Sequence, residues 1–326
     1  YFNNLKNKIN IENLNLILTK NSEVLTKIKN INLVNYGYNK NNINGLIFEK
    51  DFFISFKDNK KSLDFIIKEM GVKAQVDLKK NDVENSILGF SQVSLLNNLL
   101  KFNFEIKNDV LKVYDSNFRN KAISLSLDGL INFAPFFSID TTISINEIEQ
   151  NYIEQINLEK IINKKELLKK LNGNFIINYE NKRYFKNLVN GYQSSIKSTF
   201  GRVNFSKTIL FAGGEANCEG DSVFVEEFPG LNFYCNFKIV DKKKLFKKLS
   251  INIKDEDIPF TLGAEGSINI LNKKINFNKI QFNENFLANK EDLNYFKEKF
   301  ENILFNGSFF EIFKKEKISN YILEII

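Results

Sequence analysis

Histidine and tryptophan are absent from the 326 residues, which include only two cysteines, three prolines and one methionine. Without histidine the chain has no Ser-His-Asp or Cys-His nucleophilic system, no histidine-ligated zinc, and not the commonest general base. It also has no phosphate-binding loop, dinucleotide-binding fingerprint or Cys-x-x-Cys pair. We therefore expect a protein that is not an enzyme and has no cofactor. Chemistry by carboxylate, lysine or tyrosine side chains is the remaining enzymatic alternative.

Long hydrophobic runs are also missing. No stretch of about 18 apolar residues occurs, so we expect no membrane-spanning helix within this sequence. The first residue is Tyr1 and not methionine, so we expect a longer parent chain whose upstream part holds a signal peptide or a membrane anchor.

Arginine is scarce, although lysine and arginine together number 46 and the net charge is +7. The only arginines are Arg119, Arg183 and Arg202. Recognition of phosphates and base edges favours the planar, two-pronged guanidinium group over the lysine ammonium. We therefore expect no binding of nucleic acid.

The strongest positive feature is the alternation of apolar and polar residues from Leu96 to Ile148. In one segment Phe102, Phe104 and Ile106 alternate with polar residues, and the same pattern returns over 123–128 and 137–145. A period of two predicts strands with one apolar and one polar face, joined as an antiparallel meander.

The periodicity divides the chain into four segments. The strand pattern covers a first β-sheet region, 1–146, and a second, 173–287. Between them, 147–172 has apolar residues at spacings of three and four, which predicts a helical segment. A C-terminal helical segment, 288–326, is predicted to begin with Asn289 as N-cap.

Within the second region, the expected strands are 175–179, 194–205, 209–216, 223–227, 231–240, 267–271 and 274–283. The lysine-rich stretch 241–249 is predicted to form a short basic helix or a turn.

The two cysteines, Cys218 and Cys235, flank a stretch with a Pro-Gly turn near its centre, as in a hairpin. On neighbouring strands they would nearly face each other, and in an oxidising compartment they would form a disulfide. Two buried, unreactive thiols are the equally weighted alternative.

Three carboxylates, Glu215, Glu219 and Asp221, lie near glycines, as in an oxygen-ligand loop for calcium. Their spacing does not match the EF-hand pattern. A solvated turn is therefore the favoured interpretation, and we expect no metal site.

The apolar strand faces allow two interpretations. They form the core of a β-sandwich, in which two sheets close on each other without a ligand, or they line one long curved sheet that accommodates acyl chains. Residue pattern alone favours the common sandwich. Predicted helices between and after the strand blocks, together with 33 phenylalanines, favour the single sheet with a lipid-facing surface.

Several stretches resemble AsmA-like bacterial envelope proteins, the family of TamB and YhdP. The segment NKAISLSLDGLINFAPFFSIDTTISINEI has two alternating strands around a PFF bend, and FGRVNFSKTILFAGGEANCEG, LNFYCNFKIVDKKKLFKKLSI and GSINILNKKINFNKIQFN are similar in the same manner. The resemblance covers about residues 45–326 and rests on strand patterns, without a catalytic motif.

This resemblance implies an elongated, twisted antiparallel sheet curled into a taco-like groove, mainly β with a few amphipathic helices. It implies a non-enzymatic protein of the periplasm, anchored to the inner membrane by an upstream helix. It also implies a role in phospholipid transport between the two membranes and in outer-membrane integrity. The expected partners are phospholipid and membrane, and the sequence identifies no protein partner.

The residues predicted to line the acyl-facing surface are Phe102, Phe104, Ile106, Ile123, Leu125, Leu127, Ile139, Ile143, Phe233, Phe237, Ile268, Ile270 and Phe277. The structural or adhesive β-sandwich without a ligand stays the alternative.

Overall fold

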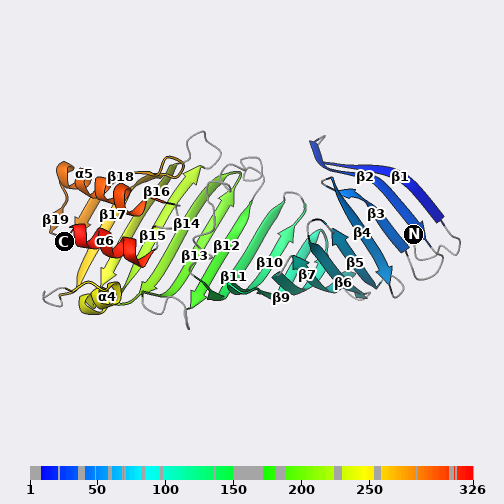
Figure 1. Cartoon of the computed structure of the whole chain (residues 1–326), viewed down its shortest axis with the longest axis horizontal. Helices are drawn as coiled ribbons and strands as arrows, with labels where there is room; N and C mark the ends of the chain where they lie inside the picture. Colours follow the sequence, from blue (N-terminus) through cyan, green and yellow to red (C-terminus); the bar gives the residue numbers. More distant parts are fainter. Residues whose placement is uncertain are drawn as a thin grey trace. The chain divides into compact units, whose positions relative to one another are not determined.

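The computed structural model of the chain is shown in Figure 1. It describes residues 9–20, 23–35, 41–47, 49–57, 61–67, 69, 71–81, 85–95, 98–134, 137–149, 172–180, 188–223, 230–252, 258–283, 285–307, 312 and 314–325. The fold is mainly β, as the alternation predicts, and the chain divides into two compact units, Tyr1–Lys121 and Ala122–Ile326. The four segments predicted from periodicity are defined by secondary structure, whereas these two units are defined by compactness, so their boundaries differ.

The described residues of the first unit form nine strands, and each strand pairs antiparallel with the next. They are β1 (Ile9–Lys20), β2 (Glu23–Asn35), β3 (Asn41–Ile47), β4 (Lys50–Lys57), β5 (Ser62–Ile67), β6 (Val72–Asn81), β7 (Ser86–Leu95), β8 (Asn98–Lys107) and β9 (Val110–Arg119). No helix occurs among the residues described in this unit.

Ten strands are described in the second unit, again paired in chain order. They are β10 (Ile123–Asn132), β11 (Ser138–Ile148), β12 (Gly173–Glu180), β13 (Val189–Thr199), β14 (Arg202–Phe211), β15 (Gly214–Val223), β16 (Gly230–Ile239), β17 (Phe260–Asn269), β18 (Lys274–Phe282) and β19 (Phe286–Leu287).

One pair in the second unit is parallel. β11 and β12 run in the same direction, with Ile143 opposite Ile177. A parallel pair requires a long crossover, and the connection from 149 to 172 provides one. The helical segment predicted for 147–172 lies almost entirely outside the described residues. The first two of its residues, 147 and 148, are the last two of β11 and not helical.

The strand predicted over 194–205 is wrong, because a tight turn divides it. Phe200 and Gly201 both have positive φ, 49° and 86°, and they connect β13 to β14. A turn with two positive φ values matches the right-handed twist of the strands that it joins. The chain therefore reverses within this apolar stretch, and two strands replace one.

Three helices and one π-helical turn are described, all in the second unit: α4 (Lys242–Leu249), α5 (Lys290–Lys299), η3 (Phe300–Leu304) and α6 (Lys315–Ile325). The predicted start of the C-terminal helical segment is confirmed. The Asn289 side chain accepts hydrogen bonds from the backbone N–H groups of Glu291 and Asp292, and Asp292 completes a capping box. Among the residues that the structure describes, no helix is long and apolar enough to cross a membrane.

Candidate functional site

The register of the first unit places apolar side chains on one face of all nine strands. In β6, for example, the half-buried Ala74 and Val76 alternate with the exposed Lys73 and Gln75. Opposite pairs such as Ile54 with Phe65 continue the apolar row from strand to strand. We call this surface the first apolar face. Its row members include Leu33, Ile43, Ile54, Phe65, Ala74, Val93, Leu100 and Phe118.

The first apolar face is hollowed over strands β1 to β5. The hollow has a volume of about 310 Å³, and every lining residue is apolar. The lining residues are Ile11, Leu14, Leu16, Ile28, Ile31, Leu33, Ile43, Ile47, Phe52, Ile54 and Phe65. A polar ligand would find no hydrogen-bonding side chain among them, whereas an aliphatic chain would meet a matching surface.

Large side chains on this face remain open to solvent. Ile11, Leu14, Leu16, Ile87 and Ile106 are 36–42% exposed, although each lies in the apolar row of its strand. Exposed apolar side chains of this size, when they gather on one face, are a feature of surfaces that contact another apolar molecule.

Three of the predicted lining residues lie together on β8 of this face. Phe104 is 6% exposed, Phe102 is half-buried, and Ile106 lies at the open end of the row. Phe104 faces Gly89 of β7 and Val113 of β9. The sequence pattern therefore places these three residues on one face, but it does not reveal that Phe104 already packs against its own sheet.

Five further predicted residues lie on one face of the second unit. We call this surface the second apolar face. Leu127 faces Ile143, Leu125 faces Ile145, and Ile123 faces Ile148 across β10 and β11. Ile139 faces Ile131 in the same pair of strands. The register therefore brings Ile123, Leu125, Leu127, Ile139 and Ile143 into adjacent apolar rows.

The other five predicted residues lie beneath helices. Ile268 and Ile270 form a buried cluster with Ile275 and Phe305, and Phe233 and Phe277 pack against it. Phe237 packs against a second cluster, which contains Leu245 and Phe246 of α4 and is joined by Ile318 and Ile322 of α6. Figure 1 shows α5 and α6 lying across this end of the second unit. The lipid-lining role of these five residues stays a prediction, and here they contact protein.

Phe300 of η3 is the central ring of this cover. Its ring makes edge contacts with Phe277 (5.8 Å between centroids), Phe305 (5.0 Å) and Tyr321 (5.7 Å). Burial raises the pKa of the Tyr321 phenol, as expected for a hydroxyl away from water. The C-terminal helical segment thus covers the apolar face over β17 and β18.

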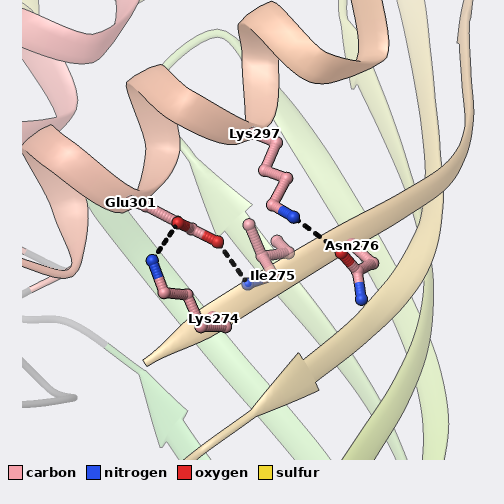
Figure 2. A network of polar contacts seen from close by, with 5 residues as sticks. All are labelled: Lys274, Ile275, Asn276, Lys297 and Glu301. Atoms are coloured by element: carbon pink, nitrogen blue, oxygen red, sulfur yellow. Dashed lines mark hydrogen bonds and ion pairs between the residues drawn. The ribbon is translucent and has the colours of Figure 1, made fainter. Parts of the chain in front are cut away.

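Polar contacts at the edge of β18 fix this segment in place (Figure 2). The Glu301 carboxylate accepts a hydrogen bond from the backbone N–H of Ile275 at 3.1 Å and pairs with Lys274 Nζ at 2.8 Å. Lys297 Nζ donates to Asn276 Oδ1 at 3.0 Å. A sheet edge exposes unpaired N–H groups, and Glu301 satisfies one of them.

Cys218 of β15 and Cys235 of β16 form a disulfide in the second unit. They are directly opposite each other in the register, with 4.1 Å between their Cα atoms. The pair lies on the second apolar face, between strands whose other face positions are also apolar or small. The disulfide therefore crosslinks the sheet within the face itself.

Lys207 of β14 is a residue of the second apolar face that the predicted set misses. Its neighbours in the row are Phe205 and Ile209, and its direct partners across the strands are Ser194 and Cys218. The signal is visible in the sequence, because Lys207 occupies an apolar position in the alternation Val203, Phe205, Lys207, Ile209, Phe211.

The three carboxylates considered for calcium lie along β15. Glu215 faces Lys238, and Asp221 accepts hydrogen bonds from the Asn232 amide. Among the described residues, no group of three or more His, Cys, Asp or Glu side chains is placed to hold a metal ion.

Comparisons with protein-family models, with curated proteins and with solved structures found no match to this chain.

Proposed function

We propose that the apolar faces bind the acyl chains of phospholipids, and that the protein binds or transfers lipid in the bacterial envelope without covalent chemistry. The observation that carries this proposal is the first apolar face. It extends over nine strands, has an entirely apolar hollow, and is not covered by a helix among the described residues of its unit.

The size of the exposed apolar area supports a ligand. Burial of apolar surface contributes about 25 cal/mol per Å², so the half-exposed isoleucines and leucines around the hollow would gain free energy from an acyl chain. Flexible aliphatic chains fit a surface of Ile, Leu and Phe without requiring polar partners. A sheet curled into a groove would bring more of this face around such a chain.

The envelope location and the transport between membranes rest on the resemblance to AsmA-like proteins. The disulfide in the second unit agrees with an oxidising compartment such as the periplasm. Inner-membrane anchoring, phospholipid as the natural ligand and support of outer-membrane integrity belong to the same proposal.

Two aspartate substitutions in β4 test the proposal. Ile54 lines the hollow, whereas the neighbouring Phe53 lies on the opposite face and is 36% exposed. Native mass spectrometry after gentle purification should find phospholipid bound to the unmodified chain and to Phe53→Asp. The Ile54→Asp variant should lose most of it, because a carboxylate on the apolar surface must be desolvated by the bound chain.

The competing interpretation is a ligand-free structural or adhesive protein. It predicts that the purified chain carries no lipid, and that Ile54→Asp unfolds the first unit instead of releasing a ligand. Circular dichroism of both variants separates these outcomes, and a lipid-free unmodified chain would refute lipid binding.

A further inference from the structure

Lys207 is the one charged residue at the face positions of β10 to β18. The pairing register defines these positions on each strand of the second unit, and all the others are apolar, small or uncharged. A single lysine within an apolar surface of this extent needs an explanation, because burial of an unpaired charge is unfavourable.

The described part of the chain places no counter-charge beside it. Among the described residues, the Lys207 ammonium forms no hydrogen bond or ion pair, and its contact is with the Phe205 ring, 5.9 Å from Nζ to the centroid. The groups directly opposite are the Ser194 hydroxyl and the Cys218 sulfur, which is already in the disulfide. Burial lowers the pKa of the Lys207 ammonium, because desolvation disfavours its charged form.

We infer that Lys207 binds the anionic headgroup of an acyl lipid whose chain lies along the second apolar face. The inference rests on the proposed lipid binding and adds a ligand class: lipids with a carboxylate or phosphate oxygen at the head. Carboxylate and phosphate headgroups both have an anionic oxygen that accepts a charge-assisted hydrogen bond from the ammonium.

The location of Lys207 makes this arrangement specific. Its strand neighbours Phe205 and Ile209 offer apolar contacts on both sides, so an acyl chain can extend along the face while its head stays at Nζ. In a surface of low dielectric, one ion pair is worth more than it would be in water. A neutral lipid would leave the ammonium unpaired and would bind less tightly.

A fluorescent fatty acid and its methyl ester test this inference on the full chain, because they share the chain and differ in head charge. We expect the acid to bind about tenfold more tightly than the ester. Lys207→Met should bring the affinity for the acid down to that for the ester and leave the ester unchanged, while Lys207→Arg should retain the preference. Lys197→Met, an exposed lysine on the adjacent strand β13, is the matched control and should behave as the unmodified chain.

The outcomes distinguish the proposed lipid binding from the proposed role of Lys207. If neither probe binds, lipid binding itself is refuted. If acid and ester bind equally, or if Lys207→Met retains the preference, lipid binding stands and the role of Lys207 is refuted. Competition by inorganic phosphate at concentrations near those of the probe would identify a free anion as the ligand and would also overturn the inference.

Discussion

Phenylalanine and glycine occupy facing positions on the apolar faces of both units. Among the directly opposed pairs, the ring is one of the atoms nearest to the glycine in five: Phe52 with Gly45, Phe104 with Gly89, Phe205 with Gly220, Phe211 with Gly214, and Phe233 with Gly266. In each of these pairs the ring lies against the glycine, and an added Cβ would be only 2.3–3.1 Å from a ring carbon. Glycine has no side chain to cover its backbone. The ring covers it instead, as in aromatic rescue of glycine in sheets.

Gly89 shows the strength of this constraint. A Cβ there would lie 2.3 Å from Cζ of Phe104 and 2.8 Å from the backbone oxygen of Asp77. We expect Gly89→Val to lower the free energy of unfolding by about 1–3 kcal/mol, because Phe104 must leave its position. The control is Gly263→Val in β17, where the nearest atom would be 3.9 Å away and the effect should be small. Urea denaturation measures both, and equal losses would contradict the packing argument.

Lys207 also has a consequence for stability. Its pKa in the folded chain is lowered by burial from the ordinary 10.5, so the unfolded chain binds more protons between the two pKa values. Stability should therefore rise with pH across that interval, as the folded-state penalty for the charged amine disappears. Lys207→Met should stabilise the ligand-free protein by about 1 kcal/mol at neutral pH and by less at alkaline pH.

Urea denaturation at neutral and alkaline pH measures this difference. Lys197→Met serves as the control for loss of one positive charge. The nearest other titratable group on the face is Tyr192 of β13, which is present in both variants. A destabilised Lys207→Met variant at neutral pH would show that the ammonium has a stabilising partner.

Among the elements, the strands with regular alternation are the ones that the sequence predicts well. In β8, β10 and β11 most of the residues at every second position are apolar, and the side chains of such strands are confined to two faces. The N-terminus of α5 is predictable for a different reason, since the Asn289 cap is local chemistry. The direction of β12 relative to β11 is not predictable, because alternation is the same for parallel and antiparallel neighbours.

The limits of sequence reasoning are clearest for Phe277. Its place in an apolar row follows from the strand pattern, but its contact with Phe300 does not, because an apolar face does not encode which apolar partner covers it. Lys207 is the opposite case. Its position on the apolar face was readable from the alternation, whereas the lack of a counter-charge required the register of β13 and β15.

The disulfide between β15 and β16 should contribute to the stability of the second unit. Its cysteines are 17 residues apart, and crosslinking a loop of that length stabilises by about 3 kcal/mol in the chain-entropy model. We expect reduction, or replacement of both cysteines by serine, to lower the free energy of unfolding by roughly that amount. The native mass should rise by two hydrogen atoms on reduction, and an unchanged mass would show free thiols.

Glu301 should control how firmly the C-terminal helical segment stays on the second apolar face. Glu301→Ala removes the acceptor for the Ile275 N–H and the partner of Lys274, so local opening should become easier by about 1 kcal/mol. Hydrogen exchange at 290–305 should accelerate, whereas Glu298→Ala, at an exposed position of the preceding helix α5, should leave exchange unchanged. Equal exchange in both variants would show that apolar packing alone holds the segment.

At the scale of the whole molecule, two compact units each carry an apolar face. If each face binds lipid, as proposed, the unfolding transition of each unit should depend on lipid. A ligand that binds only the folded state stabilises it by RT ln(1 + [L]/Kd), about 2.7 kcal/mol at a hundredfold excess over Kd. Thermal unfolding with increasing short-chain phospholipid, below the concentration at which it forms micelles, should therefore shift Tm upward by about 2 °C or more per kcal/mol.

Substitutions in each unit show which unit is responsible for the lipid-dependent shift in Tm. Ile54→Asp should remove the lipid-dependent increase of the transition that belongs to the first unit, and Phe53→Asp should retain it, because only Ile54 lies in the hollow. For an anionic phospholipid, Lys207→Met should reduce the increase for the second unit alone. A Tm that is independent of lipid, or one that falls equally in every variant, would mean that the apolar faces gain nothing from an acyl ligand, and it would favour the ligand-free structural or adhesive alternative for both units.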